Sequence, residues 1–329
     1  MKDLSFVTGA GGHLGNNLVR ALAGRGLPVA AGVRNPAHRE RLADVSCRVA
    51  LADISDKAAL TAAFRGARTV YLAAAVFRHW ARDPEREIYQ ANLQATRNAL
   101  EAAAAAGVAR VVYVSSLGAL DRAKTPIAPT TWNPKHENVY FRSKTDAEKL
   151  AWELAARLGL EMVSVLPGAF IGGNCFSLTP TMGLLRTILD RKLSVDPGFF
   201  FNFVDVADVA EGCWLAATRG RAGERYLLAN ETPTAVGEIV AIAQQMFPER
   251  DIKTPSRPPR VLLRLAASLM EGAARLRGVE PELQRNFLAE FTVREVCDIS
   301  KSRGELGFAP RASHEAIRAA LAYLSSTRP

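Results

Sequence analysis

The chain has 329 residues, of which 48% are hydrophobic, and a formal net charge of +9 at pH 7. This length suits one large α/β domain, alone or joined to a smaller one. The sequence contains no uninterrupted apolar run of about 18 residues, which argues against a membrane-spanning helix. Its arginines are spread along the chain without a basic patch interleaved with aromatic residues, so we expect no nucleic-acid partner.

The cysteines and histidines are few and scattered. No C-x-x-C pair occurs among the four cysteines, which are Cys47, Cys175, Cys213 and Cys297. This spacing favours reduced thiols over a disulfide framework or a metal site, and the unclustered histidines agree. The first predicted strand follows the start of the chain directly, which leaves no room for a signal peptide. We therefore expect a cytoplasmic protein without a bound metal.

A glycine-rich turn lies between the first predicted strand, Leu4 to Val7, and the first predicted helix, which is under way by Asn16. Strand, glycine turn and helix in this order are typical of a unit that binds a dinucleotide pyrophosphate at the helix N-terminus. The alternative is an ordinary glycine-rich turn, but the flanking elements favour nucleotide binding. The predicted cofactor contacts in this turn are Gly9, Gly12, His13, Leu14 and Gly15.

The end of the second predicted strand, residues 28–33, indicates which dinucleotide fits. An acid at this point usually holds the ribose hydroxyls of NAD. This sequence has Val33 there, followed by Arg34, with Arg39 and Arg41 nearby. A cation without an acid favours the 2′-phosphate of NADP, so we predict that Arg34 binds that phosphate. The alternative is that these arginines only face solvent on a helix.

Two further strand ends supply candidate cofactor contacts, because ligands of such sheets bind beyond the carboxyl ends of the strands. Asp53 and Ile54 follow the third strand, and Asp53 either reaches the adenine or, like Ser55, caps the next helix. Small residues follow the fourth strand and allow close approach of a cofactor: Ala73, Ala74 and Ala75. The aromatic loop after them, 76–80, suits a substrate wall.

A candidate catalytic group follows the fifth predicted strand, residues 110–114. That strand ends in Ser115 and Ser116, and Tyr140 and Lys144 lie one turn apart on a later helix. An ammonium group near a phenol lowers the phenol pKa and eases proton exchange. The Ser116 hydroxyl is placed to hydrogen-bond a carbonyl oxygen that gains negative charge. The Y-x-x-x-K spacing is weak evidence alone, and the order of the motifs strengthens it.

With these motifs, the sequence resembles the extended short-chain dehydrogenase/reductase family over nearly its whole length. Further matching segments are Asn92, Pro167-Gly168, 206–210, 223–226 and 301–310. The resemblance implies that Tyr140 is the general acid/base and that Lys144 binds the nicotinamide ribose. It implies that Ser116 orients the substrate carbonyl, with Ser115 as the fallback. It also implies cofactor contacts at Asn92, Ser115, Pro167 and Gly168.

Within that family, the sequence is most similar to the dihydroflavonol-reductase-like and hydroxysteroid-dehydrogenase-like branches, with a hopanoid-associated sugar-epimerase-like branch beside them. Sugar-nucleotide enzymes of the family usually have an arginine before the proline that follows the sixth strand. This chain has Leu166 there, and Phe201-Asn202 replaces their Arg-Asp pair. A charged sugar nucleotide would therefore find few polar anchors.

Aromatic residues in and after the loops predict a largely apolar substrate. The candidate substrate contacts are Phe77, Trp80, Ser116, Phe170, Phe176 and Phe201. A later helix, 260–277, is amphipathic, and its predicted apolar side consists of Leu262, Leu263, Leu265, Leu269, Met270 and Leu276. Arginines flank it at 257, 260, 264, 275 and 277. Packing of this side against the domain is favoured over contact with an anionic membrane, although peripheral association stays open.

The expected fold is a Rossmann-type, doubly wound parallel sheet of about seven strands with a smaller mixed C-terminal domain. Residues 1–170, with 205–230 returning to them, would bind NADP(H), and residues 171–204 and 231–329 would bind substrate. The expected activity is reversible NADPH-dependent reduction of a ketone or aldehyde. The alternatives are a sugar epimerase or dehydratase with tightly held NAD(P) and a non-catalytic dinucleotide-binding regulator. The chain would be a monomer or a homodimer.

Overall fold

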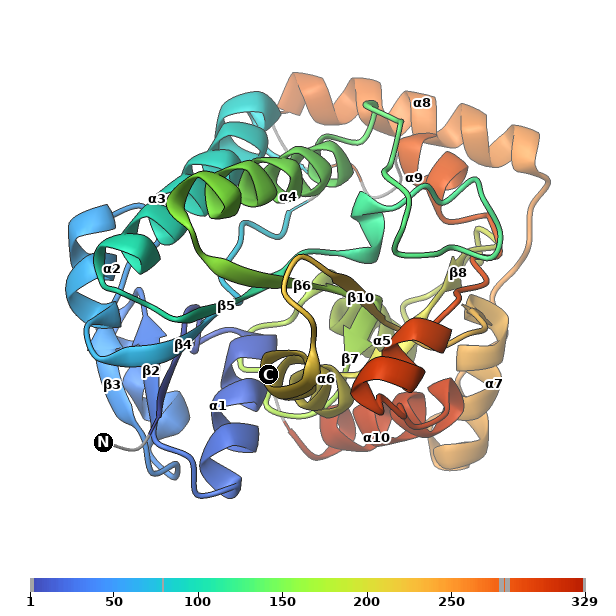
Figure 1. Cartoon of the computed structure of the whole chain (residues 1–329). Coiled ribbons are helices and arrows are strands. Elements are labelled where there is room, and N and C mark those ends of the chain that lie inside the picture. The colour runs from blue at the N-terminus through green and yellow to red at the C-terminus, as the bar shows by residue number, and fades with distance from the viewer. Residues whose placement is uncertain (1–2, 79, 278–280, 282–284, 328–329) are drawn as a thin grey trace.

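The computed structural model describes residues 3–78, 80–277, 281 and 285–327, and its centre is a seven-stranded sheet (Figure 1). All strands of this sheet are parallel, in the order β10-β6-β5-β4-β1-β2-β3. They are β1 (Leu4–Val7), β2 (Val29–Val33), β3 (Arg48–Leu51), β4 (Ala67–Leu72), β5 (Arg110–Val114), β6 (Glu161–Pro167) and β10 (Arg225–Leu228). The predicted Rossmann-type sheet is confirmed.

The chain reverses its direction across the sheet at β1. This strand pairs with β2 on one side and with β4 on the other. Open α/β sheets bind ligands at such a switch point, beyond the carboxyl ends of the strands. The glycine turn that follows β1 therefore lies where a ligand crevice is expected.

Helices cover both faces of the sheet (Figure 1). α1 (His13–Gly24) packs with α6 (Val206–Arg219) on one face, and α3 (Ala91–Ala105) packs between α2 (Lys57–Phe64) and α4 (Val139–Leu158) on the other. An apolar core lies on each face of the sheet, between the strands and the helices. Successive residues of a strand point to opposite faces, so they contribute alternately to the two cores. A turn of π-helix, η2 (Glu85–Gln90), leads into α3.

A separate apolar core forms away from the large sheet. α5 (Pro180–Leu189), α7 (Val236–Met246) and α10 (Ser313–Ser326) pack on one another there. Two small sheets adjoin them: β7 (Ala169–Ile171) with β9 (Phe203–Asp205), and β8 (Phe200–Phe201) with β11 (Thr234–Ala235). The proposed division into two domains stays a prediction. The short helices are η1 (Pro36–Leu42), η3 (Leu117–Ala119), η4 (Pro248–Arg250) and η5 (Ser302–Leu306).

The helix α8 (Arg260–Arg277) lies along an outer edge of the molecule, and the short helix α9 (Arg285–Glu290) packs beneath it (Figure 1). Leu263 and Ala267 of α8 pack against Leu288 and Phe199. The expectation that the whole leucine side of this helix is buried is wrong, because only this narrow face meets the protein. Leu262, Leu265 and Leu269 are more than half exposed. The side chains of Arg275 and Leu276 lie outside the described residues, as does His79.

No helix within the described ranges is long and apolar enough to cross a membrane.

Candidate active site

The glycine turn after β1 is built for close backbone approach. Gly9 has φ of +66°, a conformation that L side chains rarely adopt. A Cβ atom on Gly9 would lie 3.0 Å from the Cα atom of Ala74, and one on Gly15 would clash with the Gly9 carbonyl oxygen. The turn thus brings the start of α1 beside the residues that follow β4. Thr8 strengthens this link, because its hydroxyl accepts a hydrogen bond from Ala74 N–H at 3.1 Å.

The N-terminus of α1 offers backbone N–H groups without a side-chain cap. Gly12 is the N-cap residue and makes no capping hydrogen bond, and the first turn contains no acid. Such a helix end suits a phosphate group. Leu14 is buried in the core, so only its backbone faces this end of the helix. The glycine cradle and this helix terminus fit a dinucleotide pyrophosphate.

His13 is buried at the first position of α1. Its Nε2 atom hydrogen-bonds the Gly173 carbonyl oxygen at 3.0 Å, whereas Nδ1 has no hydrogen-bond partner among the described residues. Burial lowers the pKa of His13 to about 4, so the ring is neutral at pH 7. The Phe170 ring lies 5.7 Å away, which places this predicted substrate residue at the glycine turn.

Basic residues gather beside the glycine turn. Arg34 follows β2 and is exposed, and Arg41 donates a hydrogen bond to the Gly11 carbonyl oxygen at 2.7 Å. Partial burial and the charges of Arg41 and Arg34 lower the pKa of His38. The His38 ring lies so close to Gly11 that a Cβ atom there would clash with it. These three side chains could hold a second anionic group near the pyrophosphate site. Sequence reasoning did not single out His38, which no motif marks.

Asp53 takes part in a local turn after β3. Its Oδ1 atom accepts hydrogen bonds from the N–H and hydroxyl groups of Ser55, at 2.8 and 2.7 Å. The N-cap of α2 is Asp56, whose carboxylate accepts from Ala59 N–H at 3.0 Å. The predicted capping role therefore belongs to Asp56 and not to Asp53 or Ser55.

A pocket opens between the carboxyl ends of β4 and β5 and the helices α3 and α4. Its lining includes five of the predicted cofactor contacts: Ile54, Ala74, Ala75, Asn92 and Lys144. Ala73 lies between β4 and these residues and is partly exposed. The pocket is thus where the sequence places a cofactor.

Asn92 ties the loop after β4 to α3 and α4. Its amide accepts from Val76 N–H at 2.8 Å and donates to the Val76 carbonyl oxygen at 3.1 Å and to Ser143 Oγ at 3.0 Å. Ser143 in turn donates to the Tyr140 carbonyl oxygen at 2.8 Å. Asn92 therefore fixes the backbone that surrounds the pocket.

Tyr140 and Lys144 are buried one turn apart near the N-terminus of α4. Asn138 begins this helix by accepting from the N–H group of Tyr140 at 3.1 Å. The Ser116 hydroxyl accepts from Gly118 N–H at 3.1 Å and hydrogen-bonds the Tyr140 side chain. The structure thus brings together the three residues predicted to act in catalysis.

The electrostatics of this trio differ from the simplest expectation. Burial raises the pKa of the Tyr140 phenol, and only the hydrogen bond with Ser116 opposes that shift. The Lys144 ammonium group donates a hydrogen bond to the Val114 carbonyl oxygen at 3.0 Å. Burial lowers the pKa of Lys144 itself to about 8, and the charge of Glu148 partly offsets this.

A buried ion pair lies behind Lys144. Glu148, one turn further along α4, is fully buried and accepts from Arg225 at 2.9 Å and from Ser115 Oγ at 2.6 Å. The Ser115 side chain is therefore bound to this pair, and Ser116 is the serine beside Tyr140. Arg225 also stacks on Trp132 at 3.8 Å. Sequence reasoning missed Glu148 as a neighbour of Lys144, although its position four residues further along the predicted helix could have indicated it.

The carboxyl end of β6 closes another side of the crevice. Pro167 is the last residue of β6 and is buried, and Gly168 N–H donates to the Leu228 carbonyl oxygen at 3.0 Å. A Cβ atom on Gly168 would lie 2.8 Å from the Asn202 carbonyl oxygen. Asn202 itself accepts from Asn230 N–H at 2.9 Å. This asparagine therefore ties two backbone segments together.

Aromatic rings surround Tyr140. The Phe77 ring lies 5.1 Å from it and the Phe141 ring 5.8 Å from it. Phe291, which sequence reasoning missed, lies 6.2 Å from Phe141 and 5.2 Å from Phe201. Two predicted substrate residues, Phe77 and Phe201, thus belong to one aromatic cluster next to Tyr140.

The remaining predicted substrate residues lie elsewhere. Phe176 is exposed, and the Arg41 guanidinium lies 5.6 Å from the centre of its ring. Because Arg41 also binds the Gly11 carbonyl oxygen, Phe176 borders the glycine turn. Trp80 is partly exposed, next to the buried Ala81 that packs with Tyr140.

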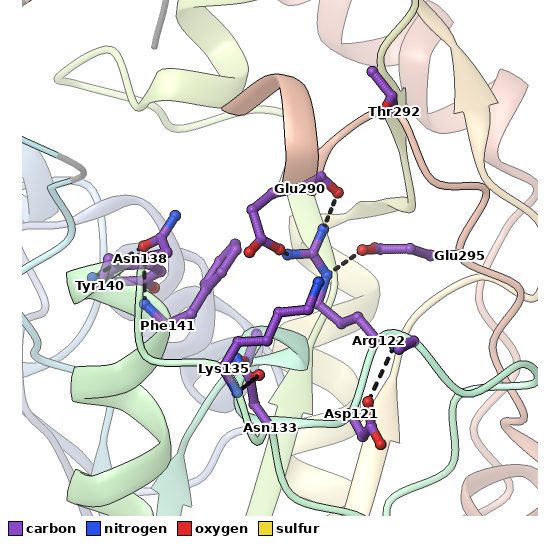
Figure 2. A network of polar contacts seen from close by, with 12 residues as sticks. Asp121, Arg122, Asn133, Lys135, Asn138, Tyr140, Phe141, Glu290, Thr292 and Glu295 are labelled. Atoms are coloured by element: carbon purple, nitrogen blue, oxygen red, sulfur yellow. Dashed lines mark hydrogen bonds and ion pairs between the residues drawn. The ribbon is translucent and has the colours of Figure 1, made fainter. Parts of the chain in front are cut away.

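Arg122 fastens the segment after α8 to this cluster, as Figure 2 shows. Its guanidinium donates to the Glu290 carboxylate at 2.7 Å and pairs with Glu295. It also stacks on Phe141 at 4.6 Å. All three charged side chains are nearly buried. Sequence reasoning missed this clamp, because 168 residues separate Arg122 from Glu290.

Within the described ranges, we find no group of three or more His, Cys, Asp or Glu side chains that could hold a metal ion.

The sheet switch point, the glycine cradle and the pocket beside Tyr140 and Lys144 define a dinucleotide-binding protein of the Rossmann class. The model of the NAD dependent epimerase/dehydratase family matches residues 5–229. The chain belongs to this family, the extended short-chain dehydrogenases/reductases, as predicted. It is thus an oxidoreductase by family, and a nicotinamide dinucleotide is its cofactor.

Individual relatives cover most of the chain. Sterol demethylase protein B of Methylococcus capsulatus is 34% identical over 97% of this chain and 97% of its own. A putative dihydroflavonol 4-reductase of Synechocystis is 33% identical over 74% of this chain and 72% of its own. The crystal structure of gox2253 is similar with a TM-score of 0.82, at 31% identity and 98% coverage of both chains.

Proposed function

We propose that the protein is an NADPH-dependent reductase, acting reversibly, of a ketone or aldehyde on a largely apolar small molecule. The observation that carries the proposal is the hydrogen bond between Ser116 and Tyr140 beside the buried Lys144. A regulator that only binds a dinucleotide has no use for this arrangement of a hydroxyl, a phenol and an ammonium group.

In this proposal each side chain has a separate task. The nicotinamide supplies a hydride to the carbonyl carbon when it is bound. Tyr140 gives its proton to the carbonyl oxygen, and its raised pKa keeps the phenol protonated at neutral pH. Ser116 hydrogen-bonds the same oxygen as negative charge develops on it. The ammonium group of Lys144 stabilises the phenolate that Tyr140 leaves behind.

The preference for NADPH rests on the basic residues beside the glycine turn. Val33 occupies the strand end where an acid would hold the ribose of NAD, and Arg34 follows it, with His38 and Arg41 nearby. An exposed guanidinium group at this point matches a phosphate dianion in charge and geometry.

The apolar character of the substrate rests on the aromatic cluster beside Tyr140. Phe77, Phe141, Phe201 and Phe291 form this cluster. Arg122, which stacks on Phe141 and Phe291, is neutralised by its pairs with Glu290 and Glu295. The names of two relatives, which mention a sterol and a dihydroflavonol, support an apolar ring system as the substrate class.

The test is NADPH oxidation with purified protein against a panel of hydrophobic ketones and aldehydes, with NADH in parallel. We expect turnover with at least one ketone or aldehyde and a marked preference for NADPH. Equal use of NADH would contradict the assignment of Arg34. Purified protein that carries stoichiometric oxidised cofactor and exchanges none of it would favour a sugar epimerase or dehydratase instead.

A further inference from the structure

The outward face of α8 consists of large apolar side chains that contact no other part of the described chain closely enough to be buried. The exposed fractions are 74% for Val261, 55% for Leu262, 58% for Leu265, 68% for Leu269 and 40% for Met270. The inward face, in contrast, consists of Leu263, Ala267 and Ala274, which are nearly buried. A continuous exposed apolar surface of this kind marks an interaction site.

The exposed residues form one row. At about 3.6 residues per turn, Val261, Leu265 and Leu269 follow one another on successive turns, and Leu262 lies beside them. Leu263 and Ala267 project from the other side of the helix, where they meet Phe199 and Leu288. α8 thus rests on the protein with one face and presents a leucine row along the other. Figure 1 shows this helix running along the rim of the molecule with no element outside it.

The charges next to this row are positive. Arg260, Arg264 and Arg277 are exposed on α8. Glu271, the one acid within this helix, is paired with Arg285 at 2.9 Å and is largely covered. The exposed charge of the described part of the helix is therefore basic, which complements an anionic surface.

We propose that α8 docks on the surface of an anionic lipid bilayer, with its leucine row, Val261, Leu262, Leu265 and Leu269, entering the interface. Helices that lie in a membrane interface combine an apolar row with flanking basic residues in this way. A second copy of the chain is a poorer partner, because pairing two such helices would place the exposed arginines of both copies at one interface. The net charge of +9 also favours approach to an anionic surface over self-association.

The position of α8 connects this surface with Tyr140. Phe199 contacts the inner face of the helix and lies 5.8 Å from Phe291. Phe291 lies 6.2 Å from Phe141, which lies 5.8 Å from Tyr140. Aromatic side chains therefore extend from the docking helix to the candidate proton donor. If the proposed reductase function holds, a substrate dissolved in the bilayer could reach Tyr140 along these aromatic side chains. The docking itself does not depend on that function.

The test is co-sedimentation of the full chain with phosphatidylcholine vesicles, with and without phosphatidylglycerol. We expect binding to the anionic vesicles that weakens as salt is added. Leu265→Gln and Leu269→Gln should each lower the vesicle affinity by about tenfold, because each removes a leucine from the interface. The control is Leu51→Gln, which changes a half-exposed leucine on β3 and should bind as the parent chain does.

The contribution of charge is tested in the same assay. Arg260→Gln and Arg264→Gln should each weaken binding about fivefold, whereas Arg65→Gln, at an exposed arginine after α2, should not. Unchanged sedimentation of the leucine variants would overturn the proposal. A second result would also overturn it: the parent chain does not bind vesicles, and light scattering shows that the parent is a dimer and the leucine variants are not. None of these readouts uses turnover, so a failed reductase assay leaves them interpretable.

Discussion

The Lys144 ammonium group donates a hydrogen bond to the Val114 carbonyl oxygen at 3.0 Å, and this bond ties α4 to the carboxyl end of β5. It holds a buried cation at the edge of the pocket lined by Ile54, Ala74 and Ala75. Burial lowers the pKa of Lys144 to about 8, within the pH range in which the enzyme can be assayed. The charge of this group is therefore sensitive to mild alkali.

Cofactor affinity should weaken as the pH rises through about 8. Below that pH the Lys144 side chain carries its charge and can bind the ribose hydroxyls, and above it the charge is lost. We expect the NADPH dissociation constant, measured by fluorescence titration, to increase about tenfold between neutral and alkaline pH. Lys144→Met should remove this dependence, whereas Lys149→Met, at an exposed lysine of the same helix, should retain it. A pH-independent affinity of the parent chain would contradict the assigned role.

Tyr140→Phe should abolish most turnover and leave cofactor binding intact. The substitution removes only the hydroxyl that hydrogen-bonds Ser116, so kcat is expected to fall about 10²- to 10⁴-fold. NADPH titration should give a dissociation constant close to that of the parent chain. The matched control is Tyr89→Phe, which removes a hydroxyl bonded to Asp146 at 3.1 Å on the outer side of α4. Full activity of Tyr140→Phe would exclude Tyr140 as the proton donor.

Arg34→Gln should reduce the preference for NADPH. A lost charge-assisted hydrogen bond to the 2′-phosphate corresponds to about a tenfold to hundredfold loss in kcat/KM with NADPH. The value with NADH should not change, because that cofactor lacks the phosphate. Arg39→Gln is the control, since Arg39 is exposed in the same segment but was not assigned to the phosphate. Equal losses with both cofactors would instead indicate a structural role for Arg34.

Sequence reasoning succeeded where a local pattern decides the structure. The strands Leu4–Val7 and Arg110–Val114 agree with the structure at both ends. Each is a short, mainly apolar run with a glycine or serine within two residues of its end, which is typical of a strand in a buried parallel sheet. That the glycine turn and Ser116 lie at the same edge of the sheet could also be predicted, since parallel strands bring their carboxyl ends to one edge. Tyr140 was predicted to join them from the order of the motifs along the chain.

It failed where the outcome depends on distant contacts. Periodicity shows that α8 is amphipathic, but only the position of Phe199 and Leu288 decides that Leu263 is covered and Leu265 is exposed. The pKa of Tyr140 was expected to fall because of the nearby Lys144, and it rises because burial of the phenol prevails. Burial of this kind cannot be read from the four-residue spacing.

Arg122→Met should destabilise the protein and release the segment around α9. The substitution leaves the Glu290 and Glu295 carboxylates nearly buried without their cation, and breaking a buried pair costs about 3–5 kcal/mol. Denaturant unfolding measures the loss, and hydrogen exchange should show faster exchange in residues 285–295. The control is Arg303→Met, whose exposed pair with Glu231 contributes less than about 1 kcal/mol. An unchanged free energy of unfolding would show that the clamp adds nothing to stability.

Acid should destabilise the protein through His13. Its pKa of about 4 in the folded chain lies below the ordinary value of 6.5, so the unfolded chain binds more protons between these two pH values. The free energy of unfolding should therefore fall as the pH is lowered from 6.5 to 4, with a His13 contribution of about 3 kcal/mol.

His13→Gln tests this contribution, because the amide can retain the hydrogen bond to the Gly173 carbonyl oxygen but cannot take up a proton. The unfolding free energy of the parent chain minus that of this variant should fall by about 3 kcal/mol as the pH is lowered from 6.5 to 4. His314→Gln is the control, since that ring is exposed beside Glu238 and its loss should leave the pH profile almost unchanged. If the His13 variant keeps the full acid dependence of the parent chain, the destabilisation must come from carboxyl groups whose pKa is lowered in the folded chain, such as Glu305 beside Arg221.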